Sequence, residues 1–199
     1  LLSTVVELSA GSGYTCALLV DGAVFCAGEN THGQLGNGTT TFNPSPVQVR
    51  LTTPQPLLEV VQIAAGDHHA CALLRDGTVR CWGAAVSAGG ASDLLLATLV
   101  GGLPAAAPPT TQANQGAVGP FVRSIAAGGD FTCAVLTDGT ARCWGQNGYG
   151  QLGNGTTGFT ATAVPVSSLT DAVSIGAGVQ HACAVTAGGA MRCWGRDAG

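Results

Sequence analysis

Four cysteine pairs with one common spacing restrict the fold of this 199-residue chain more than any other feature. Each first cysteine has a glycine five residues before it and a ring side chain two residues before it. The pairs are Cys16/Cys26, Cys71/Cys81, Cys133/Cys143 and Cys183/Cys193, the glycines are Gly11, Gly66, Gly128 and Gly178, and the rings are Tyr14, His69, Phe131 and His181. Such self-similarity indicates a repeat protein. We expect a single array over residues 1–199, with repeats at approximately 1–52, 53–118, 119–168 and a truncated 169–199.

An Asp-Gly pair stands midway between the cysteines in the first three repeats, and it is a strong hairpin signal. A two-residue loop would place Cys16 opposite Ala27, whereas a three-residue loop over 20–22 places Cys16 opposite Cys26. The three-residue loop closes with a left-handed glycine, which is where Gly22 falls. Directly opposite cysteines lie within disulfide reach. The spacing therefore predicts four local disulfides, each closing a loop of about 10 residues and contributing up to about 3 kcal/mol.

Each repeat begins with a short run rich in β-branched residues, at 5–9, 60–64, 122–126 and 173–177, before the cysteine hairpin. Alternation puts Leu73 and Val79 on the face of the Cys71–Cys81 pair and Trp82 on the other face. Because both faces are apolar, each unit must stack between neighbours. A further Pro-containing strand is expected around 46–49 and 164–166. About four strands per unit is the number found in a propeller blade.

Two segments resemble the regulator-of-chromosome-condensation repeat. Residues 66–83 carry Gly-Asp-His-His-Ala-Cys and Asp-Gly-Thr-Val-Arg-Cys-Trp-Gly, and residues 144–155 read Trp-Gly-Gln-Asn-Gly-Tyr-Gly-Gln-Leu-Gly-Asn-Gly. The resemblance implies an all-β fold, a β-propeller, usually of seven blades. The paired cysteines resemble a secreted bacterial branch, since intracellular members generally lack them. The chain departs from the pattern in having four repeats, Ala27 in place of tryptophan, and no Gln-Leu-Gly tract in the second repeat.

Residues 84–109 replace that tract in the second repeat. Paired glycines and prolines interrupt the segment, at Gly89-Gly90, Gly101-Gly102, Pro104 and Pro108-Pro109. We predict that it leaves the blade core as an excursion on the rim, with one short helix over 93–100.

The ends of the array raise the question of closure. Four blades of a seven-blade ring would cover a little over half a circle, so we expect an incomplete ring or part of a larger assembly. The outer faces of the end units would then be available to copies of the chain or to another protein. The residues expected in that contact are Val5, Val6, Leu8, Val173, Ile175 and Trp194.

Composition and residue placement favour binding over catalysis. Seven basic residues, all arginine, and eleven acidic residues give a net charge of −4, which disfavours a nucleic-acid partner. No apolar run reaches the ~18 residues needed to span a membrane. His68, His69 and His181 lie at or beside the ring position, which Tyr14 and Phe131 fill elsewhere, so we expect packing between blades rather than metal binding. No catalytic, metal or cofactor site is predicted.

Several polar residues fit turns. Asp21, Asp76 and Asp138 are expected to cap their own hairpin turns. Asn37-Gly38-Thr39 and Asn154-Gly155-Thr156 match the glycosylation sequon and also the turn tract of the family. The turn interpretation is favoured, and glycosylation of Asn37 and Asn154 stays open.

Eight paired cysteines imply an oxidising compartment, so we expect an extracellular or cell-surface location. The leading hypothesis is a secreted or surface-exposed scaffold for protein interaction or structural assembly, and not an enzyme. An alternative is an inhibitor that docks a rim loop into a secreted enzyme. Nucleotide exchange on a small GTPase, or chromatin binding, is the nuclear role that the resemblance implies, and the acidic, lysine-free composition counts against it.

Overall fold

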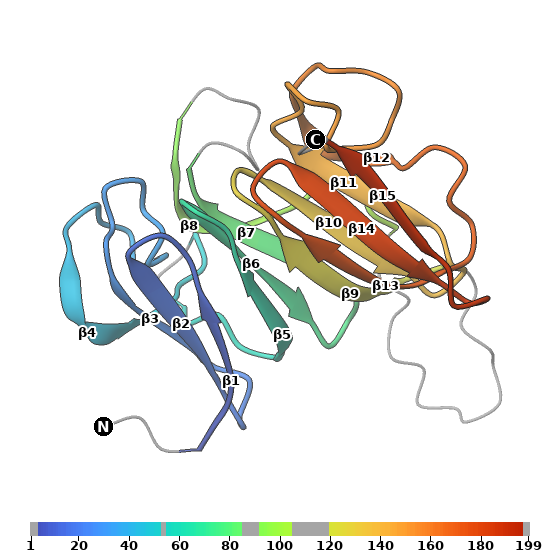
Figure 1. Cartoon of the computed structure of the whole chain (residues 1–199). Helices are drawn as coiled ribbons and strands as arrows, with labels where there is room; N and C mark the ends of the chain where they lie inside the picture. The colour runs from blue at the N-terminus through green and yellow to red at the C-terminus, as the bar shows by residue number, and fades with distance from the viewer. Residues whose placement is uncertain (1–3, 53–54, 85–91, 105–119, 197–199) are drawn as a thin grey trace, which may run out of the picture.

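The computed structural model describes residues 4–52, 55–84, 92–104 and 120–196, which form strands and turns with no helix among them (Figure 1). The first blade contains β1 (Val5–Ala10), β2 (Tyr14–Leu19), β3 (Val24–Gly28) and β4 (Asn43–Gln48), and the second contains β5 (Val60–Ala65), β6 (His69–Leu74), β7 (Val79–Gly83) and β8 (Leu94–Leu99). The third contains β9 (Val122–Ala127), β10 (Phe131–Leu136), β11 (Ala141–Gly145) and β12 (Thr160–Pro165), and the fourth contains β13 (Ala172–Ala177), β14 (His181–Thr186) and β15 (Met191–Gly195).

Each blade is an antiparallel sheet whose strands follow chain order. Blades one to three have four strands, and the described part of blade four has three. The first strands of the blades, β1, β5, β9 and β13, lie against one another along the inner side of the array (Figure 1). The prediction of an all-β fold built from propeller blades is confirmed.

The cysteine hairpins have the predicted register. Cys16 lies opposite Cys26, and the loop between them is closed by a hydrogen bond of 2.9 Å from the Gly22 amide to the Leu19 carbonyl. Gly22 has a φ of 81°, in the left-handed region that glycine tolerates. The turn aspartates cap as predicted, since the Asp76 carboxylate accepts a 2.8 Å bond from the Thr78 amide. The structure contains disulfides at Cys16–Cys26, Cys71–Cys81, Cys133–Cys143 and Cys183–Cys193, with Cα–Cα distances of 4.0–4.1 Å.

One disulfide differs from the others in exposure. The cysteines of the first three pairs are buried, whereas Cys183 is partly exposed and Cys193 is exposed. We expect mild thiol reduction of dilute protein to open Cys183–Cys193 first, because thiol–disulfide exchange requires access to a sulfur atom. Alkylation followed by peptide mass spectrometry measures the order. Labelling of Cys16 and Cys26 at the same rate would contradict the expectation, and labelling in denaturant, where all four pairs are accessible, provides the control.

The two faces of a blade have different roles. We call the face with the cysteine pair and the ring residue the disulfide face, and the opposite face the tryptophan face. The disulfide face of each of the first three blades packs against the tryptophan face of the next, so that Cys16 and Leu18 share a buried cluster with Ile63 and Trp82. Equivalent clusters fill the second and third joints. The core is therefore divided among three joints between blades.

The repeated glycines mark where neighbouring blades approach most closely. A Cβ atom on Gly11 would clash with the Gly66 carbonyl oxygen, and one on Gly66 would clash with the Gly128 carbonyl oxygen. On Gly128 it would clash with the Gly178 carbonyl oxygen and the Phe131 ring. Absence of a side chain is thus what allows the loops after the inner strands to meet.

The prediction for residues 84–109 is wrong where the structure describes them. Residues 94–99 form β8, the fourth strand of blade two, and not a helix on the rim. The outer edge of β7 has backbone groups that need partners, and β8 supplies them. Ala97 is fully buried in the joint with blade one and donates a 2.9 Å amide bond to the Arg50 carbonyl. Residues 85–91 and 105–109 lie outside the described residues.

The predicted contact surface at the ends of the array also needs correction. Ile175 and Trp194 pack against blade three, and the Trp194 indole nitrogen donates a 2.8 Å bond to the Gln151 carbonyl. Alternation along a strand shows which residues share a face, but it does not show which face points toward the preceding blade. Val5, Val6, Leu8 and Val173 are exposed.

Candidate functional site

Long loops project from one end of the blades. The connections β1–β2 and β3–β4, and their equivalents, leave the same end of each sheet because the strands are antiparallel and follow chain order. Loops of neighbouring blades hydrogen-bond there: the Asp67 amide donates to the Gly129 carbonyl over 2.8 Å. We call this end the loop rim and define it by residues 11–13, 29–42, 66–68, 128–130 and 146–159.

A buried asparagine holds each of two long loops, the β3–β4 loop of blade one and the β11–β12 loop of blade three. The Asn30 side-chain amide donates to the carbonyls of Thr39 (2.9 Å) and Thr41 (3.1 Å), while its oxygen accepts from the Leu35 amide (2.9 Å). Asn147 makes the same set of bonds in blade three, to Thr156, Gly158 and Leu152. Both asparagines are fully buried. The loops are therefore rigid extensions of their blades.

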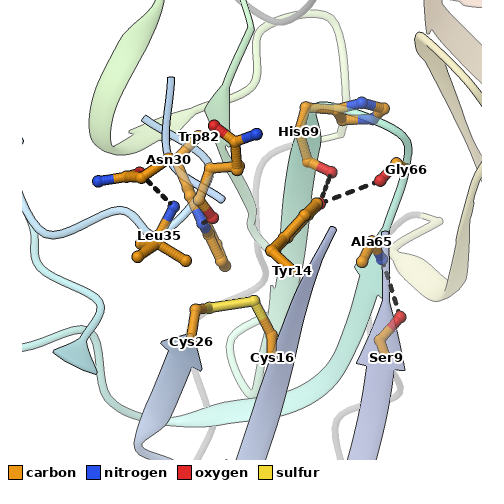
Figure 2. Close-up of a disulfide and its surroundings, with 11 residues drawn as sticks. Ser9, Tyr14, Cys16, Cys26, Asn30, Leu35, Ala65, Gly66, His69 and Trp82 are labelled. Carbon is orange, nitrogen blue, oxygen red and sulfur yellow. Dashed lines mark hydrogen bonds between the residues drawn. A yellow bond between two sulfur atoms is a disulfide. The ribbon is translucent and has the colours of Figure 1, made fainter. Parts of the chain in front are cut away.

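The same loops connect to the following blade through tryptophan. The Trp82 indole nitrogen donates a 2.8 Å bond to the Gln34 carbonyl of blade one. Trp194 does the same with Gln151. Figure 2 shows Trp82 beside Asn30 and Leu35 of the blade-one loop. The buried indole nitrogen of Trp144 has no such acceptor among the described residues, and the second repeat lacks the Gln-Leu-Gly tract.

Aromatic side chains project from the two clamped loops. Phe42 is 55% exposed and Phe159 is 40% exposed, and each stands directly before the fourth strand of its blade. Tyr149 is also exposed, and the Arg196 guanidinium lies 4.8 Å from the centre of its ring. Exposed aromatic residues on a rigid support are typical of protein-binding surfaces.

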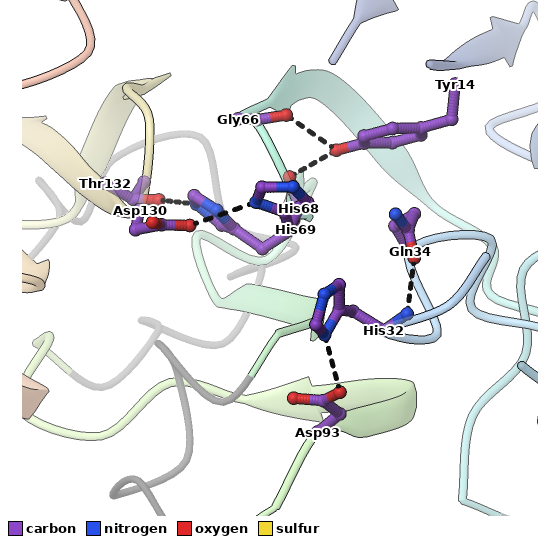
Figure 3. A network of polar contacts seen from close by, with 9 residues as sticks. All are labelled: Tyr14, His32, Gln34, Gly66, His68, His69, Asp93, Asp130 and Thr132. Atoms are coloured by element: carbon purple, nitrogen blue, oxygen red, sulfur yellow. Dashed lines mark hydrogen bonds and ion pairs between the residues drawn. The ribbon is translucent and has the colours of Figure 1, made fainter. Parts of the chain in front are cut away.

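Two histidines and two carboxylates from blades one to three lie close together at this end of the blades (Figure 3). His32 Nδ1 lies 3.0 Å from Asp93 Oδ2, and His68 Nδ1 lies 3.6 Å from Asp130 Oδ1. The two imidazole rings contact each other edge to face, with their centres 5.1 Å apart. All four side chains are partly open to solvent. Within the described residues, no group of three or more His, Cys, Asp and Glu side chains has the arrangement of a metal site.

The ring residues lie in the joints, as predicted, in the first three repeats. The Tyr14 hydroxyl donates to the Gly66 carbonyl (3.1 Å) and contacts the His69 carbonyl (Figures 2 and 3). His69 Nε2 lies 2.7 Å from Thr132 Oγ1 of blade three. Burial, together with the charge of Asp67, raises the pKa of Tyr14 above its ordinary value. His181, in contrast, is exposed.

Burial of His69 predicts sensitivity to acid. Desolvation lowers the pKa of His69 to about 4, against an opposing effect of Asp130. Between the ordinary histidine pKa and pH 4 the unfolded chain binds a proton that the folded chain does not. The contribution of His69 to the free energy of unfolding is thus fully present above about pH 6.5, and it decreases by on the order of 3 kcal/mol as the pH drops to 4.

His69→Phe tests this expectation, because the joint accepts a phenylalanine, Phe131, at the same repeat position of blade three. We expect the variant to show a flatter loss of stability between pH 6.5 and 4, measured by urea unfolding at several pH values. An unchanged slope would show that His69 does not titrate in this window.

The sequence analysis did not identify Asn30 and Asn147, which we call the asparagine clamps of the two long loops. A signal was present: asparagine stands three residues after the tryptophan position in the first and third repeats, as Asn30 and Asn147, and both repeats carry Gln-Leu-Gly. The second repeat lacks both features. The asparagines of the two sequons, Asn37 and Asn154, lie in the same two loops and form turns there. The Asn37 side-chain oxygen accepts a 3.1 Å bond from the Thr39 amide, and that of Asn154 accepts a 3.1 Å bond from the Thr156 amide.

These observations define a class: an array of propeller blades, each with an internal disulfide, that carries long loops on one rim. The model of the regulator of chromosome condensation (RCC1) repeat matches residues 21–73 and 138–185, and a second model of the same repeat matches 5–34, 60–90 and 122–151. The chain belongs to the RCC1 repeat family.

The chain is similar to several characterised proteins. It is 30% identical over 158 residues to the ultraviolet-B receptor UVR8 of Arabidopsis thaliana, covering 76% of this chain and 32% of the receptor. It is 32% identical over 153 residues to the mouse regulator of chromosome condensation, covering 77% of this chain and 34% of that protein. The chain thus spans about a third of the length of these relatives.

Solved structures have the same fold. Yeast RCC1 (Prp20), in its complex with Kap60, superimposes with a TM-score of 0.72 at 21% identity, covering 96% of this chain and 43% of that one. Human WBSCR16 superimposes with a TM-score of 0.74 at 22% identity, covering 96% and 47%. Among the described residues, none forms a helix long and apolar enough to cross a membrane.

Proposed function

We propose that this chain is a secreted or cell-surface scaffold that binds another protein through its loop rim and catalyses no reaction. The observation that carries the proposal is the pair of asparagine-clamped loops, each with an exposed phenylalanine at its end. Rigid loops lose little conformational entropy on binding, and exposed aromatic residues supply apolar area.

Two further observations support the proposal. Four disulfides suit an oxidising compartment, which favours the extracellular location. Relatives bind proteins: yeast RCC1 was solved with Kap60, and Prp20p was studied for binding to Gsp1p and histones. A net charge of −4 favours a protein partner over nucleic acid, whose phosphate backbone it would repel.

The test is capture of partners from the native extracellular medium by the purified, oxidised chain. The double variant Phe42→Ala, Phe159→Ala should lose a captured partner, with at least a tenfold weaker affinity, on the order of 1.4 kcal/mol or more. Val20→Ala is the matched control, because Val20 is 68% exposed in the hairpin turn at the opposite end of the blade. Equal capture by both variants would place binding elsewhere and contradict the proposal.

A further inference from the structure

Two histidines from neighbouring blades contact each other on the loop rim, and the proposed function does not use them (Figure 3). His32 lies in the long loop of blade one, and His68 lies between β5 and β6 of blade two. Their rings meet edge to face, with the centres 5.1 Å apart. The His32 side chain is 45% exposed and that of His68 is 43% exposed. The pair is therefore accessible to a dissolved ligand.

A carboxylate from the following blade lies beside each imidazole. Asp93 Oδ2 of blade two is 3.0 Å from His32 Nδ1, and Asp130 Oδ1 of blade three is 3.6 Å from His68 Nδ1. An ionised carboxylate only accepts hydrogen bonds, so it favours the proton on the Nδ1 atom that faces it and leaves the lone pair of the neutral ring on Nε2. Histidines that bind metal ions commonly have this arrangement, in which the carboxylate orients the ring and makes it a stronger ligand.

The Nε2 atoms of the two rings are free to bind an ion. Among the described residues, neither His32 Nε2 nor His68 Nε2 has a hydrogen-bond partner. His69 differs, because it is buried and its Nε2 lies 2.7 Å from Thr132 Oγ1. Two imidazoles on one tetrahedral ion, with metal–nitrogen bonds of about 2.0–2.1 Å, have ring centres about 5 Å apart. The separation of the His32 and His68 rings is close to this value.

Backbone contacts hold both histidines in place before an ion binds. The His32 amide donates a 2.8 Å bond to the side-chain oxygen of Gln34, which is buried. The His68 carbonyl accepts a 2.8 Å bond from the Ala84 amide, and the next residue, His69, is buried in the joint with blade three. A site on a fixed backbone loses little conformational entropy when it binds a ligand.

We propose that His32 and His68 bind one divalent transition-metal ion through their Nε2 atoms, while Asp93 and Asp130 orient the rings and water fills the other coordination positions. Imidazole suits Zn²⁺, Cu²⁺ and Ni²⁺, and all eight cysteines are in disulfides, so no thiolate competes for the ion. Two protein ligands make an exchangeable site, in contrast to structural zinc sites with four. The ion connects blade one to blade two. Packing was expected for His68 because the sequence does not show that His32 lies beside it.

The experiment is calorimetric titration of the untagged, oxidised 199-residue chain with ZnCl₂, after removal of metal with EDTA. We expect one ion per chain and a dissociation constant in the micromolar range. His32→Ala and His68→Ala should each weaken binding at least about tenfold, because each removes one of the two ligands. Asp130→Asn should weaken it about tenfold, since the orienting carboxylate is lost. His181→Ala is the control, because His181 is an exposed histidine on blade four outside the pair.

Two further measurements show that the ion binds at the pair. NMR of the imidazole nitrogens should show that Zn²⁺ shifts Nε2 of His32 and His68 more than their Nδ1 atoms, with His181 unchanged. Added ZnCl₂ should raise the Tm of the wild-type chain, because a ligand that binds the folded state stabilises it. The Tm of His32→Ala should not respond, although without zinc it should match that of wild type.

Two results would overturn the proposal. One is a wild-type chain that releases no heat of binding at millimolar Zn²⁺. The other is equal binding by wild type, His32→Ala and His68→Ala, which would assign the ion to carboxylates elsewhere on the surface. The Phe42→Ala, Phe159→Ala variant should bind Zn²⁺ like wild type. Failure of metal binding and failure of partner capture are therefore distinguishable.

Discussion

Gly128→Ala is expected to destabilise the chain by about 3 kcal/mol or more, although it adds only one methyl group. The new Cβ would clash with the Gly178 carbonyl oxygen of blade four and with the Phe131 ring of its own blade. Phe131 is fully buried, and Gly178 belongs to the backbone of an adjacent blade, so neither can move without opening the joint. Urea unfolding followed by circular dichroism measures the loss.

Gly148→Ala is the control for this variant. Gly148 lies in the long loop of blade three, is exposed, and has no atom within 4 Å of the position that a Cβ would take. We expect its free energy of unfolding to stay within about 0.5 kcal/mol of wild type. Equal effects of the two substitutions would mean that the approach of blades three and four at Gly128 does not determine stability.

Trp82→Ala is expected to cost about 3–5 kcal/mol, the range for a large aromatic residue removed from a core. Trp82 is fully buried in the first joint, and its indole nitrogen holds the Gln34 carbonyl of the clamped loop. The substitution should therefore loosen the loop as well as the joint. Hydrogen exchange of the Leu35 amide, which donates to Asn30, should speed up together with global unfolding.

Trp194→Ala tests whether burial is the cause. Trp194 makes the same indole bond, to Gln151, but its side chain is only partly buried. We expect it to cost less than Trp82→Ala, and the comparison is best made by urea unfolding under identical conditions. Equal losses for the two variants would show that the hydrogen bond common to both, and not the buried area, dominates, and a larger loss for Trp194→Ala would contradict the expectation.

The sequence was sufficient for the parts of the fold that depend on local spacing. The register of Cys16 against Cys26 followed from an odd spacing and a glycine, and the opposite faces of Leu73 and Trp82 followed from alternation. The sequence did not show which face of a blade packs against the preceding blade. Alternation assigns the residues of a strand to two faces, but it does not show which neighbouring blade each face contacts. For that reason Leu8 and Ile175, at one repeat position, were both expected to be exposed, whereas Ile175 packs against blade three.

The strand β8 and the asparagine clamps were missed for a different reason. Their partners, such as Arg50 for Ala97 and Thr41 for Asn30, are set by loops whose paths depend on the neighbouring blade. Alignment of Val100 with Val49 and Val166, the residues that follow the fourth strands, would have indicated β8. The prediction was based instead on the paired glycines and the prolines of residues 84–109.

Dividing the core among joints has a consequence for how such a molecule can change in length. A joint is complete once two successive blades are present, so its free energy depends on those two blades alone. A duplication that inserts a whole repeat therefore adds one joint of a type already present and leaves the others unaltered. Stability should then grow roughly in proportion to the number of joints, as in a one-dimensional chain of coupled units, and the chain can be lengthened or shortened by whole repeats without the design of a new core.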